Sequence, residues 1–154
     1  MAIIHDPMRV PPRQTTIYPA PYNTGFEGRL KRALTDRLSL TQFGVNLTTL
    51  EPGAQSAHRH WHENEDEFIY ILEGELVLVL MDGEHKLRPS MAVSFPAGDR
   101  NGHHLINRSA HRATYLEIGT RCKDENVVYP DIDLTAEKRD GKYTFFHKDG
   151  TPYE

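Results

Sequence analysis

The pattern of apolar and polar residues changes at Thr41, where a period of two begins and predicts β-strands for much of the remaining chain. The clearest run covers residues 41–49 and stops at Pro52-Gly53, a pair typical of turns. Further strands are predicted at residues 68–72, 76–81, 85–88, 92–95, 114–118, 127–134 and 143–147. Asp82-Gly83 and Asp140-Gly141 separate neighbouring runs, as expected of hairpin turns.

Many short strands separated by turn signals are typical of an all-β sandwich or barrel. With 154 residues, the chain suits a single domain with one core, whose central part covers residues 41–120. The runs at 68–72 and 76–81 are apolar on both faces, so they need cover on the outside as well as the inside. An N-terminal arm could supply this cover, as could a second subunit, and we expect a homodimer.

The two ends of the chain differ from this central part. Residues 1–25 are rich in proline, which predicts an extended arm along the surface. Leu30, Leu34 and Leu38 then recur at helical spacing, but the segment is too short for more than two helical turns. We assign residues 1–40 to the N-terminal arm. Residues 121–154 are too aromatic for a disordered tail, so we expect them to pack on the barrel.

Composition and charge exclude several classes of function. Lysine and arginine number 18 against 22 acidic residues, and no basic stripe suggests nucleic acid or a membrane surface as a partner. The longest apolar run is far shorter than the about 20 residues that span a bilayer, and the first residues show no signal peptide. Cys122 is the only cysteine, which excludes an internal disulfide and fits a reducing compartment. We expect a soluble cytoplasmic protein.

The histidines carry the main functional signal. Three of the nine stand at alternate positions: His58, His60 and His62. On a strand, alternate side chains point to the same face, so these three imidazoles would line one wall. Glu67 follows, and His103 and His104 form a second cluster. Imidazole suits Zn, Cu, Fe and Ni, and a carboxylate beside it adds Mn, so the pattern predicts a transition-metal site.

Two segments resemble the motifs of the cupin superfamily. The first cupin motif is written G-x5-H-x-H-x3–4-E-x6-G. Here the sequence His-Trp-His at residues 60–62, four further residues, Glu67, six residues and Gly74 agree with the body of that motif. Gly53 stands one residue further upstream than the pattern requires.

The second cupin motif, G-x5-P-x-G-x2-H-x3-N, is matched in part. Pro96 and Gly98 have the required spacing, and His103 precedes Asn107 at the required distance. Ser90 occupies the position of the leading glycine, and two residues are inserted between Gly98 and His103.

Register within the first motif decides which histidines are ligands. Counting back from Gly74 through Glu67 selects His60 and His62. The alternative pair, His58 and His60, would leave six residues before Glu67. His58 has the parity of the ligands, so it could orient one of them, contact a substrate or act as an acid or base.

The resemblance covers about residues 41–120 and implies a small double-stranded β-helix, the jelly-roll barrel of the cupins. It also implies one divalent transition metal, Zn, Mn, Fe or Ni, held by three histidines and a carboxylate: His60, His62, Glu67 and His103. Asn107 selects His103 for this set, while its neighbour His104 should face the other way on a strand and is the alternative fourth ligand.

Such an open metal site can act as a Lewis acid, activate water or bind a substrate through its oxygens. Further candidates for proton transfer or for binding an anionic substrate are Tyr70, Glu73, Glu117, Arg59 and Arg121. The resemblance implies a reaction from the sugar or sugar-phosphate isomerases, epimerases, lyases and dioxygenases. We favour an isomerase-like enzyme acting on a small oxygen-rich metabolite. The alternatives are an iron-dependent dioxygenase and a non-catalytic protein that binds or senses a small molecule.

Overall fold

The computed structural model describes residues 1–154 and contains twelve strands and two three-residue 3-10 helices. The strands are β1 (Arg29–Ala33), β2 (Phe43–Leu50), β3 (Trp61–His62), β4 (Glu67–Glu73), β5 (Leu76–Leu80), β6 (Gly83–Leu87), β7 (Ala92–Phe95), β8 (His104–Ile106), β9 (Ala113–Thr120), β10 (Glu125–Tyr129), β11 (Leu134–Arg139) and β12 (Lys142–Phe146). The helices are η1 (Pro7–Arg9) and η2 (Asp36–Leu38), and neither could cross a membrane.

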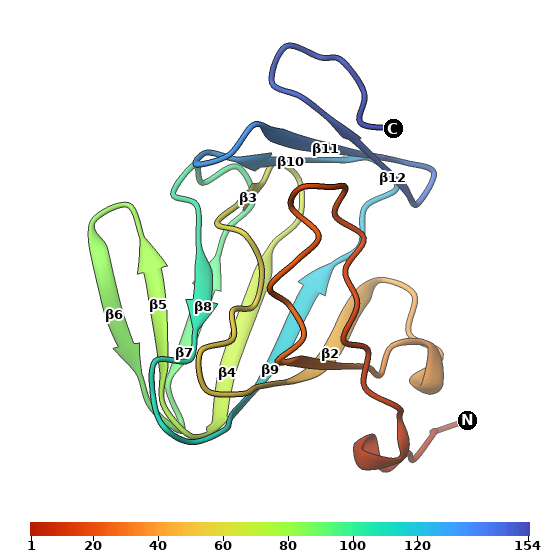
Figure 1. Ribbon diagram of the computed structural model, residues 1–154. Helices are drawn as coiled ribbons and strands as arrows, with labels where there is room; N and C mark the ends of the chain where they lie inside the picture. Colours follow the sequence, from red (N-terminus) through yellow and green to blue (C-terminus); the bar gives the residue numbers. More distant parts are fainter.

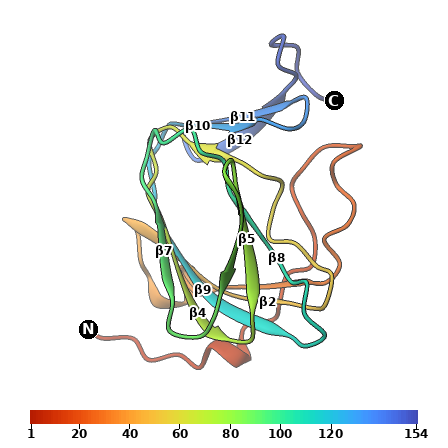
Figure 2. The ribbon, with the colours of Figure 1, turned by 90° about the vertical axis from the view of Figure 1, so that its left-hand side faces the viewer.

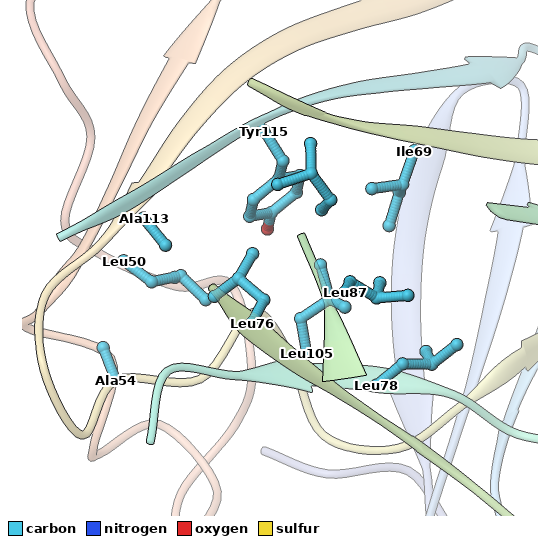
Figure 3. Packing of buried hydrophobic residues seen from close by; sticks show 10 residues of the cluster. Leu50, Ala54, Ile69, Leu76, Leu78, Leu87, Leu105, Ala113 and Tyr115 are labelled. Carbon is cyan, nitrogen blue, oxygen red and sulfur yellow. The ribbon is translucent and has the colours of Figure 1, made fainter. Parts of the chain in front are cut away.

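Two facing sheets form the barrel (Figure 1, Figure 2). One sheet has the order β1-β2-β9-β4-β7 and the other has the order β6-β5-β8. The main core between them is drawn in Figure 3 and consists of Leu50, Ala54, Ile69, Ile71, Leu76, Leu78, Leu87, Leu105, Ala113 and Tyr115. From β4 to β9 the chain passes back and forth between the two sheets. The predicted double-stranded β-helix is confirmed.

A third sheet, in the order β12-β11-β10-β3, lies across one end of the barrel (Figure 1, Figure 2). Trp61 and His62 of β3 pair with β10, so this sheet is joined to the segment that carries the alternating histidines. Its buried side chains pack with Tyr18 and Tyr22 of the N-terminal arm. The arm and the C-terminal segment therefore meet at this end of the barrel.

The predicted strand over residues 127–134 is wrong in its second half. β10 ends at Tyr129, residues 130–133 form a turn, and β11 begins at Leu134 and pairs back on β10. Pro130 has no backbone N–H to continue a ladder, which favours a turn at this point.

The segment from residue 26 to residue 40 also differs from the helical expectation. It contains no α-helix, because β1 pairs antiparallel with β2, with Arg29 opposite Leu50, and only η2 is helical. The hydrogen bonds offered by the neighbouring strand outweigh a leucine spacing that suits a helix. Strand geometry turns Arg29 and Lys31 to one face of the sheet, and both line the interior cavity described below.

The outer face of the larger sheet is covered in one half only. Val10 of the arm packs with Val45 in a small cluster over the outward side chains of β2 and β9. On β4 the outward side chains are exposed, to 38% at Phe68, 36% at Tyr70 and 48% at Leu72. The arm therefore covers only part of the apolar surface for which the sequence predicts cover.

The homodimer stays a prediction, and the exposed row on β4 is the surface that a second copy would bury. Phe68→Ser is expected to convert a dimer to a monomer, because it replaces one of the large apolar side chains of this row with a small polar one. Analytical ultracentrifugation of both proteins at one concentration measures this change. Met81→Ser is the control, since Met81 is 70% exposed just beyond the end of β5. A wild-type monomer, or a Phe68→Ser dimer as stable as the wild type, would refute the prediction.

Candidate metal centre

The strand pairing brings the predicted ligands together. His60 and His103 form an antiparallel bridge, in which His60 N donates to His103 O over 3.1 Å and His103 N donates to His60 O over 2.8 Å. Residues directly opposed in such a bridge carry their side chains on the same face. His62, two residues further on, and Glu67, the first residue of β4, reach the same space. The four residues selected from the motifs thus converge.

The Glu67 carboxylate lies among the three imidazoles. Its Oε2 is 2.7 Å from His103 Nε2 and 3.7 Å from His60 Nε2, and its Oε1 is 3.4 Å from His62 Nε2. Two ligand atoms about 2.1 Å from one ion lie about 3.0–3.4 Å apart, which these spacings approach. Glu67 Oε2 is buried and, although His103 Nε2 is 2.7 Å away, it makes no well-aligned hydrogen bond, which leaves it available to a cation. The cluster could hold a metal ion.

The protonation states in the cluster also suit a cation. Burial by itself would raise the pKa of Glu67, but the contacts with His103, His60 and His62 more than offset burial and hold it well below its usual range. Burial lowers the pKa of His103 to about 4, so this imidazole is neutral at pH 7. Burial opposes the charged form of His62 too, yet the contacts with Glu67 raise its pKa. A metal ligand must be a neutral imidazole, so metal binding and protonation of His62 Nε2 would compete.

Two buried carboxylates lie behind His62. Glu65 Oε2 and Glu125 Oε2 are each 3.9 Å from His62 Nδ1. Both already have partners, since Glu65 accepts from Lys138 and a backbone N–H, and Glu125 accepts from three backbone N–H groups. The His62 ring thus has Nδ1 towards these carboxylates, too far away for a hydrogen bond, and Nε2 towards Glu67.

His103 and His104 lie on opposite faces at β8. The His103 ring stacks on Phe95 with centroids 3.5 Å apart, and its Nε2 meets Glu67. His104 Nδ1 instead lies 3.0 Å from the carbonyl oxygen of Ala57.

The His103→Ala variant is expected to lose most of its metal, whereas His104→Ala should keep it, because only His103 contacts Glu67. Elemental analysis of the two purified variants measures the difference. The opposite result, with metal retained in His103→Ala and lost in His104→Ala, would make His104 the fourth ligand.

The remaining positions of the second motif shape the backbone. Asn107 is fully buried, and its amide donates to the carbonyl oxygens of Leu50 and His111. Ser90 has a φ of 74°, in the left-handed region that glycine favours, and it stands where the motif has its leading glycine. This departure from the motif changes the residue but keeps the conformation of a glycine turn.

His58 is not brought to the cluster. Its Nε2 lies 2.9 Å from the carbonyl oxygen of Tyr22, and its ring packs against those of Tyr18 and Phe26. The parity argument does not apply here, because residues 56–59 form bends rather than a regular strand. The geometry connects His58 with the N-terminal arm and offers no support for an acid–base role.

The cluster opens into a cavity of about 230 Å³. The N-terminal arm and the C-terminal sheet supply much of its wall: Thr16, Ile17 and Tyr18 from the arm, and Tyr129, Tyr143 and Phe145 from the sheet. Because pockets for drug-sized ligands measure about 300–1,000 Å³, this one suits a small metabolite.

Charged residues line the same cavity, and most of them were not expected from the sequence. They are Arg13, Arg29, Lys31 and Glu117, of which only Glu117 was a candidate. Arg29 and Lys31 stand two residues apart, so reading their segment as a strand would have placed both on one face.

The other sequence candidates lie elsewhere. Tyr70 and Glu73 are exposed on β4. Arg59 forms a two-point ion pair with Asp131, at 2.7 and 2.8 Å. Arg121 lines a neighbouring pocket that also reaches His62 and Glu67.

A family model described as "Cupin domain" matches residues 46–119. No curated protein matches the chain.

Several solved structures are similar. A sugar phosphate isomerase from a cupin superfamily, of Silicibacter pomeroyi, is 42% identical with a TM-score of 0.92, over 97% of this chain and 95% of that chain. A protein of Acidithiobacillus ferrooxidans, provisionally named a sugar phosphate isomerase, is 24% identical with a TM-score of 0.79, over 92% of this chain and 88% of that one. The polyketide cyclase RemF of Streptomyces resistomycificus is 21% identical with a TM-score of 0.62, over 78% and 80%. The last two share the fold alone. With 42% identity to a cupin over nearly its whole length, the chain belongs to the cupin superfamily.

Proposed function

We propose that this protein is a metal-dependent isomerase of a small sugar or sugar phosphate. One observation carries the proposal, namely that three imidazoles and a carboxylate converge at a small cavity that charged residues also line. The similar protein of Silicibacter pomeroyi, which is 42% identical, is named a sugar phosphate isomerase. One divalent transition metal, Zn, Mn, Fe or Ni, suits this donor set.

The residues in this proposal have distinct tasks. The four that would hold the ion are His60, His62, Glu67 and His103. When bound, the ion supplies a Lewis acid that polarises the carbonyl and hydroxyl oxygens of the sugar. The rings of Tyr18 and Tyr129 pack edge to face beside the cavity, with centroids 5.6 Å apart, and burial raises the pKa of both phenols. Their hydroxyls therefore stay protonated and can donate hydrogen bonds to substrate oxygens.

Glu117 is the group that we assign to proton transfer between adjacent substrate carbons. Its Oε1 accepts hydrogen bonds from Lys31 Nζ and Asn46 Nδ2, both over 2.9 Å, while its Oε2 accepts none. Burial would raise the pKa of Glu117, but Lys31 and Asn46 offset burial and lower it. The carboxylate is thus ionised at neutral pH, with one oxygen free at the cavity to accept a proton.

The test is turnover of aldose and ketose phosphates by protein loaded with each metal in turn, with and without oxygen, followed by NMR. Isomerisation independent of oxygen is expected. Glu117→Gln should lower kcat by about 10²–10⁴ with its metal content unchanged. Glu84→Gln, which removes an exposed carboxylate on β6, should behave as wild type.

Two results would contradict the proposal and identify its rivals. Turnover that requires both Fe(II) and oxygen would indicate a dioxygenase. Tight binding of a sugar phosphate without turnover at any metal would indicate a binding or sensing protein.

A further inference from the structure

Arg29 is a buried arginine with no acidic partner. Only 5% of the residue is exposed. Its terminal nitrogens donate to two backbone carbonyl oxygens, of Ser56 over 2.7 Å and of Thr15 over 3.1 Å. Its Nε is buried without any hydrogen-bond partner. A guanidinium has five N–H donors, so several remain for a ligand, and a buried charge is costly unless something compensates it.

The acidic groups of the cavity are already engaged elsewhere. Glu117 forms an ion pair with Lys31 at 2.9 Å, and Glu67 is surrounded by the histidines. Neither carboxylate forms an ion pair with Arg29. The cavity therefore contains a positive charge that no side chain neutralises.

A second free guanidinium comes from the N-terminal arm. Arg13 pairs through its backbone with Lys31, with Arg13 N donating to Lys31 O over 2.8 Å and Lys31 N donating to Arg13 O over 3.0 Å. This pairing puts the Arg13 side chain on the cavity side of β1, where it makes no hydrogen bond or ion pair within the chain. Arg13 and Arg29 thus line one cavity with their charges uncompensated.

We propose that Arg29 and Arg13 form a phosphate subsite, which binds the phosphate of a phosphorylated sugar while its carbonyl end faces the histidine cluster. The inference rests on the proposed function and specifies its substrate class. A phosphate monoester carries about −1.5 to −2 charges at neutral pH, which two arginines balance, and its oxygens match the donor fork of a guanidinium. The arm is then part of the substrate site, since it supplies Arg13 and the Thr15 carbonyl that holds Arg29.

Calorimetric titration of the metal-loaded protein with inorganic phosphate tests the subsite directly. Wild type should bind phosphate, and Arg29→Gln and Arg13→Gln should each bind it roughly tenfold more weakly or worse, the effect of losing a charged hydrogen bond. Arg32→Gln is the matched control, because it removes the same charge from the opposite face of β1. Acetate should bind more weakly than phosphate, because it has one charge.

Kinetics and metal analysis separate this inference from the proposed function. Both arginine variants should keep wild-type metal content and raise KM for the phosphorylated sugar, with little change for the same sugar without phosphate. If Arg29→Gln does not fold, Arg29→Lys and the exposed Arg13→Gln decide the question.

Three results would overturn the subsite: no phosphate binding by wild type, wild-type phosphate affinity in Arg13→Gln and in the folded Arg29 variant, or acetate binding as tight as phosphate binding. Absence of isomerase turnover with phosphate binding intact would instead refute the reaction and leave the subsite standing.

Discussion

Glu67→Ala and His60→Ala are each expected to lose nearly all bound metal, to below about a tenth of the wild-type content. Glu67 lies within 3.7 Å of all three imidazole Nε2 atoms, and His60 is bridged to His103 through the backbone. Glu67→Ala removes the negative charge of the predicted ligand set. His60→Ala removes one of its imidazoles and so breaks its geometry. Elemental analysis of freshly purified protein measures metal per chain, and circular dichroism shows that the variants are folded.

His58→Ala is the matched control for this pair, because it removes a neighbouring imidazole that lies outside the cluster. Its metal content should equal that of wild type. If His58→Ala lost the metal while His60→Ala retained it, the register counted from Gly74 would be wrong. Full metal content in both Glu67→Ala and His60→Ala would place the site elsewhere.

Gly74→Ala is expected to reduce the free energy of unfolding by about 2–5 kcal/mol. Gly74 has a φ of 77°, a conformation that costs residues with a Cβ about 1–2 kcal/mol. An added Cβ would also lie 2.5 Å from the carbonyl oxygen of Arg112 and 2.7 Å from the Cα of Ala113, so backbone must move. Urea denaturation of apo-protein measures the loss without a contribution from metal binding.

Gly141→Ala provides the comparison, because Gly141 has a φ of 79° but no atom within 4 Å of the position that a Cβ would take. Its cost should be the conformational part alone, about 1 kcal/mol. Equal losses in the two variants would mean that the close approach of Arg112 and Ala113 contributes nothing.

The same glycine helps to select, from the sequence, side chains that the structure brings together in one cluster, and their role as metal ligands stays a prediction. Gly74 follows β4 at a turn that no other residue fits well, and the motif spacing counted back from it reaches Glu67, although a β-bulge between Ile71 and Glu73 interrupts the strand. His103 is selected through the motif position of Asn107, whose buried amide donates to the carbonyl oxygen of Leu50.

The errors occur where long-range contacts decide the conformation. Residues 29–33 become a strand because β2 is beside them, which no local spacing reveals. His58 does not share a face with His60 and His62, because the chain bends at residues 56–59. Its ring packs instead against Tyr18 and Phe26 of the arm. Arg29 and Arg13 meet only after the arm has folded back along β1.

The arm's backbone pairing with β1 has a consequence for how this barrel can change. The segment that matches the cupin family, residues 46–119, contains all four metal-cluster residues, whereas Arg13, Arg29, Tyr129 and Tyr143 lie outside it. The four predicted metal ligands thus come from the segment shared with the family, whereas the two arginines proposed to bind phosphate come from the N-terminal segment. Exchanging the two terminal segments between related barrels would therefore replace the residues proposed to bind the substrate while keeping the four predicted ligands.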